Sequence, residues 1–287
     1  MEESWSLEVW AKLPGYLALL CGTGAAVALA FARAAAPGDA LAPRLRRLAR
    51  LAGVLGVAAV VLRALAHAAA LDGPAGAFEL DTLRLVVIDS RWGGSWQWHA
   101  ATAVAVALTS WRVGAARGLL VYAIALAAAV LVAPFLGHGA GALSRGALHS
   151  LHLAVTGAWL GTVVVLALAS GRAVTPARTD ALGGIISRFS PWALACASVA
   201  GVSGVVLAWL YVGSVDGFLG TFYGRVLLLK LALIGAIGAC GFLNWRRAGR
   251  REAPSFVLIR AEAALAILAI AVTALLTETE HPEVEAE

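Results

Sequence analysis

The most distinctive chemistry of the sequence lies in one apolar segment that opens with two histidines, His149 and His152. Residues three apart share one face of a helix, so the two imidazoles are predicted to be neighbours. Trp159 lies seven residues beyond His152 and returns to that face. Imidazole is a common ligand of copper and zinc, so the pair is a candidate metal site. The alternative is that both are ordinary polar residues at a membrane interface.

Three further histidines, each in or beside another apolar segment, are candidate metal ligands of the same kind: His67, His99 and His138. His138 stands between two glycines shortly before the pair. These side chains can join His149 and His152 only if the second to fifth apolar segments pack together at one end.

Charged residues inside apolar segments are costly, so they indicate either function or pairing with another group. Arg63 lies four residues before His67 and shares its helix face. Lys230 either extends its ammonium group to the interface or lines a cavity. Glu262 either pairs with another helix or relays protons or cations.

The amino-acid composition indicates that these residues belong to a membrane protein. Of 287 residues, 61% are hydrophobic and 14% are charged, whereas soluble domains have about 25% charged residues. A helix needs ~20 apolar residues to cross the hydrocarbon. The sequence therefore predicts an all-α, polytopic membrane helix bundle with eight transmembrane segments: 13–32, 48–71, 96–111, 118–136, 148–169, 185–212, 224–245 and 255–277. The lipid bilayer is the expected partner, and the net charge of +5 is no sign of nucleic-acid binding.

The distribution of lysine and arginine predicts the orientation. Most of these residues fall in the loops that follow the first, third, fifth and seventh segments. Arginine-rich loops are retained in the cytoplasm, so we expect both termini to be periplasmic, with an acidic C-terminal tail. All six histidines then lie on the periplasmic side, and the expected location is a bacterial inner membrane.

Weak internal similarity predicts two four-helix halves with the same orientation. The N-terminal half is residues 1–139, with a long outer loop at 72–95, and the C-terminal half is residues 140–287. The segment 81–89 in that loop is expected to be a short amphipathic helix or a strand. Only the second half carries a histidine pair at the start of its first segment.

The sequence contains no motif of a known catalytic constellation, neither a P-loop, nor a nucleophile elbow, nor HExxH. We therefore expect a transporter or metal-handling protein rather than an enzyme. The single methionine excludes a copper path built on thioethers. A copper site would have to use histidine or cysteine.

Several motifs in the C-terminal half resemble the bacterial copper resistance protein D (CopD/PcoD) family. They are the histidine pair with its Trp159-Leu-Gly161, Arg188-Phe-Ser, Ala200-Gly-Val-Ser-Gly204, Thr221-Phe-Tyr-Gly-Arg-Val-Leu-Leu-Leu-Lys230 and Arg260-Ala-Glu262. The resemblance implies copper transport or handling across the inner membrane, beside a periplasmic CopC-like copper chaperone. It places copper on His149, His152 and His138, and with less support on His67 and His99.

A second resemblance points to another class. HemJ-type membrane proteins also combine an early histidine in a helix with a later lysine, and His152 and Lys230 correspond to that pattern. That resemblance implies a haem-binding membrane redox protein with His152 as axial ligand. The sequence leaves copper and haem as alternatives.

Overall fold

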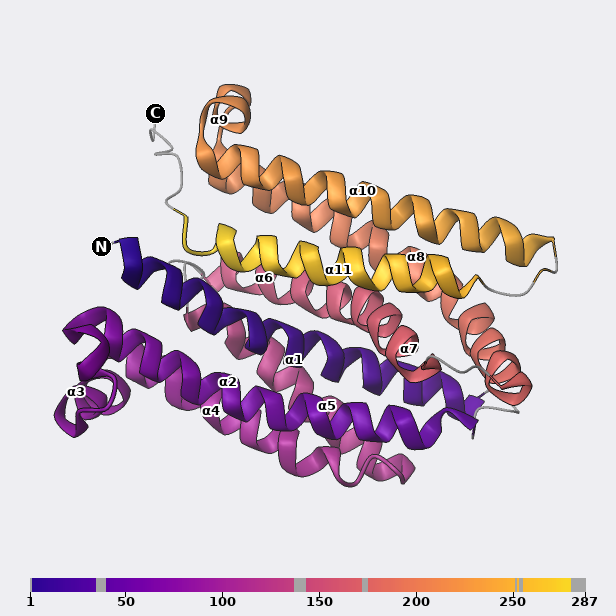
Figure 1. Cartoon of the computed structure of the whole chain (residues 1–287), viewed down its shortest axis with the longest axis horizontal. Helices are drawn as coiled ribbons and strands as arrows, with labels where there is room; N and C mark the ends of the chain where they lie inside the picture. Colours follow the sequence, from indigo (N-terminus) through magenta and orange to yellow (C-terminus); the bar gives the residue numbers. More distant parts are fainter. Residues whose placement is uncertain are drawn as a thin grey trace.

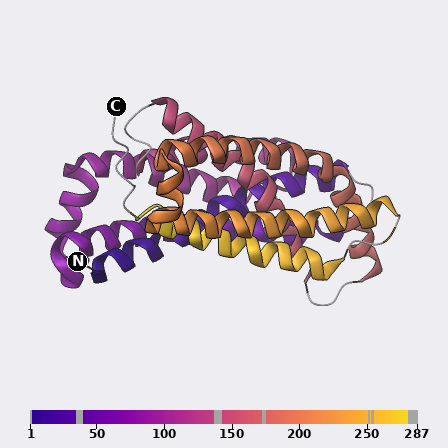
Figure 2. The same ribbon diagram turned by 90° about the horizontal axis from the view of Figure 1, so that it is seen from above.

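The computed structural model describes residues 2–34, 40–136, 143–171, 175–250, 252 and 255–279. These residues form helices and no strands, which confirms the predicted all-α bundle. The long helices run side by side along the longest axis of the molecule (Figure 1). The view turned by 90° shows the same parallel arrangement (Figure 2).

Four long helices lie within residues 2–136, the described part of the predicted first half, and four more within residues 143–279, the described part of the predicted second half. They are α1 (Glu2–Ala34), α2 (Ala42–Gly76), α4 (Arg91–Ser110) and α5 (Ala116–Val132, extended by the turn η3, Ala133–Leu136), then α6 (Leu143–Thr156) continuing through η5 (Gly157–Gly161) into α7 (Thr162–Ser170), α8 (Pro176–Val212), α10 (Phe222–Gly249) and α11 (Phe256–Leu276). Short helical pieces are α3 (Leu80–Arg84), η2 (Leu85–Asp89) and α9 (Val215–Gly220).

Within the described ranges, seven helical segments are long and apolar enough to cross a membrane, and α4 is not among them. The positions of the two chain ends nevertheless indicate that α4 also crosses the membrane. Lys12 near the start of α1 forms an ion pair with Glu278 just beyond α11, so both lie at one end of the bundle. An even number of crossings follows, and the 20 residues of α4 span about 30 Å. Seven of the eight predicted segments are confirmed as membrane-length helices, the topology fits α4 as the eighth, and the chain is a multi-pass membrane protein.

Helices α1, α4, α7 and α10 terminate at the opposite end, which we call the arginine-rich end. The end that holds Lys12 and Glu278 is the terminal end. Arginines at the arginine-rich end cap helix carbonyls that have no partner in their own helix. Arg44 Nη1 donates to the Ala169 carbonyl at 2.8 Å, and Arg260 Nη2 donates to the Gly171 carbonyl at 2.7 Å. Arg44 thus ties the first half to the end of α7.

Local sequence explains where the elements of the predicted outer loop begin and end. The α2 helix is interrupted at Asp72 and Gly73, and Gly73 has φ 73°. The interruption begins one residue beyond residue 71, the predicted end of the segment. Residues 80–89 are helical, which settles the choice between helix and strand for the segment 81–89. Ser90 then caps α4, since its hydroxyl accepts a hydrogen bond from the Gly93 N–H at 2.8 Å.

Helix α1 lies at the centre of the bundle and packs against helices of both halves: α2, α5, α7, α8 and α11. The closest approach is between α1 and the wide turn η5. A Cβ placed on Gly24 would collide with the Gly161 carbonyl group, and a Cβ on Gly161 would collide with the Leu20 carbonyl oxygen. Two backbones can come this close only because both residues lack side chains, as in other small-residue contacts between membrane helices.

We predict that Gly24→Ala destabilises the protein by about 1–3 kcal/mol, because the added methyl group forces α1 away from η5. Thermal unfolding in detergent would show a lower midpoint. Gly238→Ala in α10 is the matched control, since its Cβ would meet no atom within 4 Å. Equal midpoints for Gly24→Ala and Gly238→Ala would contradict this account of the interface.

Candidate metal-binding site

The histidine pair on α6 faces α8, near the terminal end of the second half. His149 Nε2 lies 2.7 Å from the Tyr211 hydroxyl, and His152 Nδ1 lies 3.0 Å from Ser203 Oγ. Gly204 lets the imidazole of His152 lie against α8, because a Cβ there would come within 3.2 Å of His152 Cε1. Both imidazoles therefore have hydrogen-bonding neighbours inside the membrane, as the cost of burying polar groups requires.

The surroundings of Ser203 determine which nitrogen of His152 carries the proton. The Ser203 hydroxyl has one hydrogen, and Oγ lies 2.7 Å from the Val199 carbonyl oxygen, which can only accept. Ser203 therefore donates to Val199 and accepts from His152 Nδ1–H. The lone pair of His152 is then on Nε2, the arrangement in which a neutral imidazole binds a metal.

Lys230 comes from α10 and lies within electrostatic range of His152. The sequence alternatives for this lysine were an interfacial ammonium group or a cavity-lining one, and the structure places it among the helices of the second half. The two residues that the HemJ-type resemblance selects are thus close in space. Tyr211 was not among the predicted residues, and only its place as a polar group in an apolar helix singles it out.

A second group lies where α1, α2 and α4 meet at the terminal end. His67 Nδ1 donates to Glu8 Oε1 at 2.9 Å, and its ring stacks on Trp92 with centroids 4.4 Å apart. The carboxylate can only accept, so in the neutral imidazole of His67 the lone pair also lies on Nε2. Glu8 was missed by sequence reasoning, although its i,i+4 spacing from Lys12 is a signal.

A pocket of about 270 Å³ adjoins this second group. Lys12 lines it and also donates to the Thr277 carbonyl at 3.2 Å, beside its ion pair with Glu278. The wall includes side chains from five parts of the chain: Glu8, Lys12, Arg63, His67, Trp92, Leu136, Thr277, Glu278 and Thr279. The predicted proximity of Arg63 to His67 is confirmed, since both line this pocket.

His99 lies on α4, and its Nδ1 is buried without a hydrogen-bond partner among the described residues. Arg63 lies within electrostatic range of it. The remaining predicted ligand, His138, falls outside the described residues, as does the predicted boundary between the halves at 139 and 140.

Two other predicted residues contact neither a described histidine nor the pocket in a printed interaction. Trp159 is partly buried against a core cluster formed by α1, η5, α7, α10 and α11. Glu262 is buried in α11, at 7% exposure, and accepts a hydrogen bond from Asn244 of α10. Asn244 Oδ1 in turn accepts from the Ser255 N–H at 3.1 Å. The pairing of Glu262 with another helix, one of the two sequence alternatives, is therefore confirmed.

In the described part of the chain, no three His, Cys, Asp or Glu side chains gather as a metal site would require. The described histidines form two groups, one in each half. His149 and His152 point to α8, and His67 to Glu8 of α1. Each group offers imidazole nitrogens for a metal ion, and the His67 group also offers the carboxylate of Glu8.

The fold is that of a multi-pass helical membrane protein with histidines near one end of the bundle, and comparison with known proteins specifies the family. The family described as "Copper resistance protein D-like, N-terminal domain" matches residues 3–150, and "Copper resistance protein D" matches residues 183–276. The first match alone covers more than half of the chain. The chain therefore belongs to the copper resistance protein D family.

One curated relative is the "Copper transport protein CutJ" of Bacillus subtilis, which is 31% identical over 135 residues. The alignment covers 46% of this chain and 25% of the relative, so the chain spans only about a quarter of that protein's length. No solved structure matches the chain.

The hydrogen bonds of Ser203 predict that Ser203→Ala changes the tautomer of His152, because Nδ1–H loses its acceptor. In protein with ¹⁵N-labelled histidine, the wild-type signals of His152 should show a protonated Nδ1 and an unprotonated Nε2. Ser203→Ala should give a mixture of tautomers. Ser198→Ala, on an exposed part of the same helix, should leave the signals unchanged. A protonated Nε2 in the wild type would refute the assignment.

Proposed function

We propose that this chain transports or handles copper across the bacterial inner membrane, and that histidines near the periplasmic ends of its helices bind the copper. The family and the curated relative are named for copper resistance and copper transport. The observation that carries the proposal is the state of His67 and His152. Each donates from Nδ1 to a fixed acceptor, which presents Nε2 as a metal ligand.

The chemistry of these groups suits copper. Imidazole nitrogen binds both common oxidation states of the metal, and the single methionine of the chain leaves histidine as the main donor. In this proposal His149 and His152 form the site of the second half, with His138 as a further ligand. His67, with Glu8 behind it, and His99 form a second site beside the pocket of the first half.

The proposal includes an orientation in the membrane and a periplasmic partner. The arginine-rich end lies in the cytoplasm and the terminal end in the periplasm, by the positive-inside rule. A periplasmic CopC-like chaperone would then meet both histidine groups from outside. In this proposal copper passes inward between the two four-helix halves, 1–139 and 140–287, either downhill or coupled to an ion; the given sequence carries no nucleotide-binding motif.

A haem-binding redox protein is the second candidate, and one observation favours it. His152 lies within electrostatic range of Lys230, the residue that the HemJ-type pattern pairs with the axial histidine. Haem ligation would use the same Nε2 lone pair of His152. Copper and haem therefore compete for one nitrogen, and an analysis of the purified protein separates them.

We expect purified protein, loaded with copper and then desalted, to retain copper and to show no Soret band. His149→Ala/His152→Ala should lose the copper of the second-half site, measured as metal per protein by mass spectrometry. His281→Ala, in the C-terminal tail, is the matched control. A Soret band that disappears in the double variant would instead favour the haem-binding protein. Unchanged copper content in the double variant would refute the site.

We also expect Glu8→Ala to weaken copper binding at His67 by about 10–100-fold, the usual cost of removing a group that orients a histidine ligand. Titration with a competing chelator measures this affinity. Glu79→Ala removes an exposed carboxylate from the same end of the bundle and should have no effect. If both variants bind copper as the wild type does, His67 is not a ligand.

A further inference from the structure

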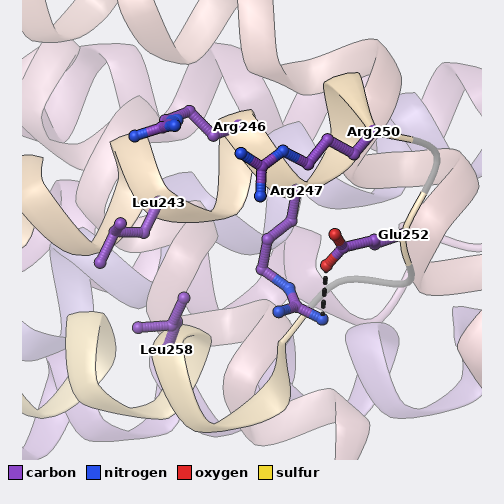
Figure 3. Close-up of a pocket in the computed structure, with 6 residues that line it drawn as sticks. All are labelled: Leu243, Arg246, Arg247, Arg250, Glu252 and Leu258. Carbon is purple, nitrogen blue, oxygen red and sulfur yellow. Dashed lines mark ion pairs between the residues drawn. The ribbon is translucent and has the colours of Figure 1, made fainter.

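The end of α10 presents one leucine and three arginines on one face. Leu243, Arg246, Arg247 and Arg250 follow the spacing i, i+3, i+4, i+7, which places their side chains together. Arg250 directly follows the last residue of α10, and its N–H still donates to the Arg247 carbonyl at 3.0 Å, as in a final helical turn. Together with Glu252 and with Leu258 of α11, these residues line a pocket of about 390 Å³ (Figure 3).

The positive charge of this pocket exceeds its negative charge. Arg247 Nη2 forms an ion pair with Glu252 Oε2 at 3.1 Å. Arg246 lies over the Phe242 ring at 5.9 Å, and within the described ranges no carboxylate pairs with Arg246 or Arg250. Figure 3 shows Arg246 and Arg250 on one side of the pocket and the Arg247–Glu252 pair on the other.

One guanidinium donor in the pocket has no acceptor despite the nearby Glu252 carboxylate. Arg247 Nε is buried and has no hydrogen-bond partner among the described residues. A buried donor without a partner costs about 1–3 kcal/mol. A ligand with several anionic oxygens would accept from it and would neutralise the neighbouring guanidinium groups.

The other half of the pocket is apolar and faces the membrane. Leu243 and Leu258 come from two adjacent helices, and Phe242, Trp245 and Val257 beside them are exposed, at 53%, 63% and 77%. Aromatic residues at such a helix end are typical of the membrane interface. An occupant therefore meets guanidinium groups at one side and hydrocarbon at the other.

We propose that this pocket binds an anionic phospholipid, with its phosphate between Arg246, Arg247 and Arg250 and an acyl chain along Leu243 and Leu258. Guanidinium groups bind phosphate oxygens in pairs of parallel hydrogen bonds. Basic pockets between membrane helices bind anionic headgroups in the same way. A free phosphate ion would use the arginines but not the leucines. The site is independent of the copper-binding histidines, which lie at the other end of the bundle.

The test is native mass spectrometry of the full chain in neutral detergent, titrated with dioleoylphosphatidylglycerol, dioleoylphosphatidylcholine or inorganic phosphate. We expect the first phosphatidylglycerol to bind at least about tenfold more tightly than phosphatidylcholine. Arg246→Gln/Arg250→Gln should weaken this first binding by roughly 30-fold, from the usual contribution of each arginine near a headgroup. Both side chains are exposed, so the variant should fold, and its unfolding midpoint without lipid checks this.

Arg112→Gln/Arg117→Gln is the matched control, since it removes two exposed arginines from another loop at the same end. It should bind phosphatidylglycerol as the wild type does. If both double variants lost phosphatidylglycerol affinity equally, overall charge and not this pocket would attract the lipid, and the proposal would be overturned. Displacement of the lipid by an equal concentration of inorganic phosphate would assign the pocket to free phosphate instead.

Discussion

The backbone contact between Gly24 of α1 and Gly161 of η5 sets the geometry on which the rest of the bundle depends. In a membrane, apolar burial does not drive helices together, so close packing must do so. The two glycines allow α1 to lie against the second half while α2 and α5 cover its other sides. Because α6 runs directly into η5, this contact also fixes the depth of α6. It therefore determines where His149 and His152 meet α8.

Several polar groups inside the bundle are met by specific partners on other helices, because hydrocarbon offers none. Ser203 passes its hydroxyl hydrogen to its own helix and accepts from His152. Asn244 holds Glu262 through one atom of its amide and the start of α11 through the other. Arg44 caps the end of α7. The same rule that stabilises the fold thus orients the imidazole that we propose as a ligand.

The two histidine groups give the copper proposal a particular form. One group belongs to the first half, where His67 is held between Glu8 and Trp92, and the other belongs to the second half. Each half therefore carries its own candidate site near the same end of the bundle. Two separate sites suit a metal that is received from outside and then passed on, because transfer requires more than one place to bind.

The sequence alone determined the helical class, seven of the membrane segments, the arginine-rich end and the family, because each depends on local composition or on short motifs. Hydropathy was weakest for α4, where Arg91, Gln97 and His99 dilute the apolar run, and only the meeting of α1 with the end of α11 requires its crossing. The histidines were visible as candidates. Their partners were not, because Glu8 and His67 are 59 residues apart and His152 and Ser203 are 51 apart. Which nitrogen of each imidazole faces a ligand depends on those partners, so the tertiary structure alone decided it.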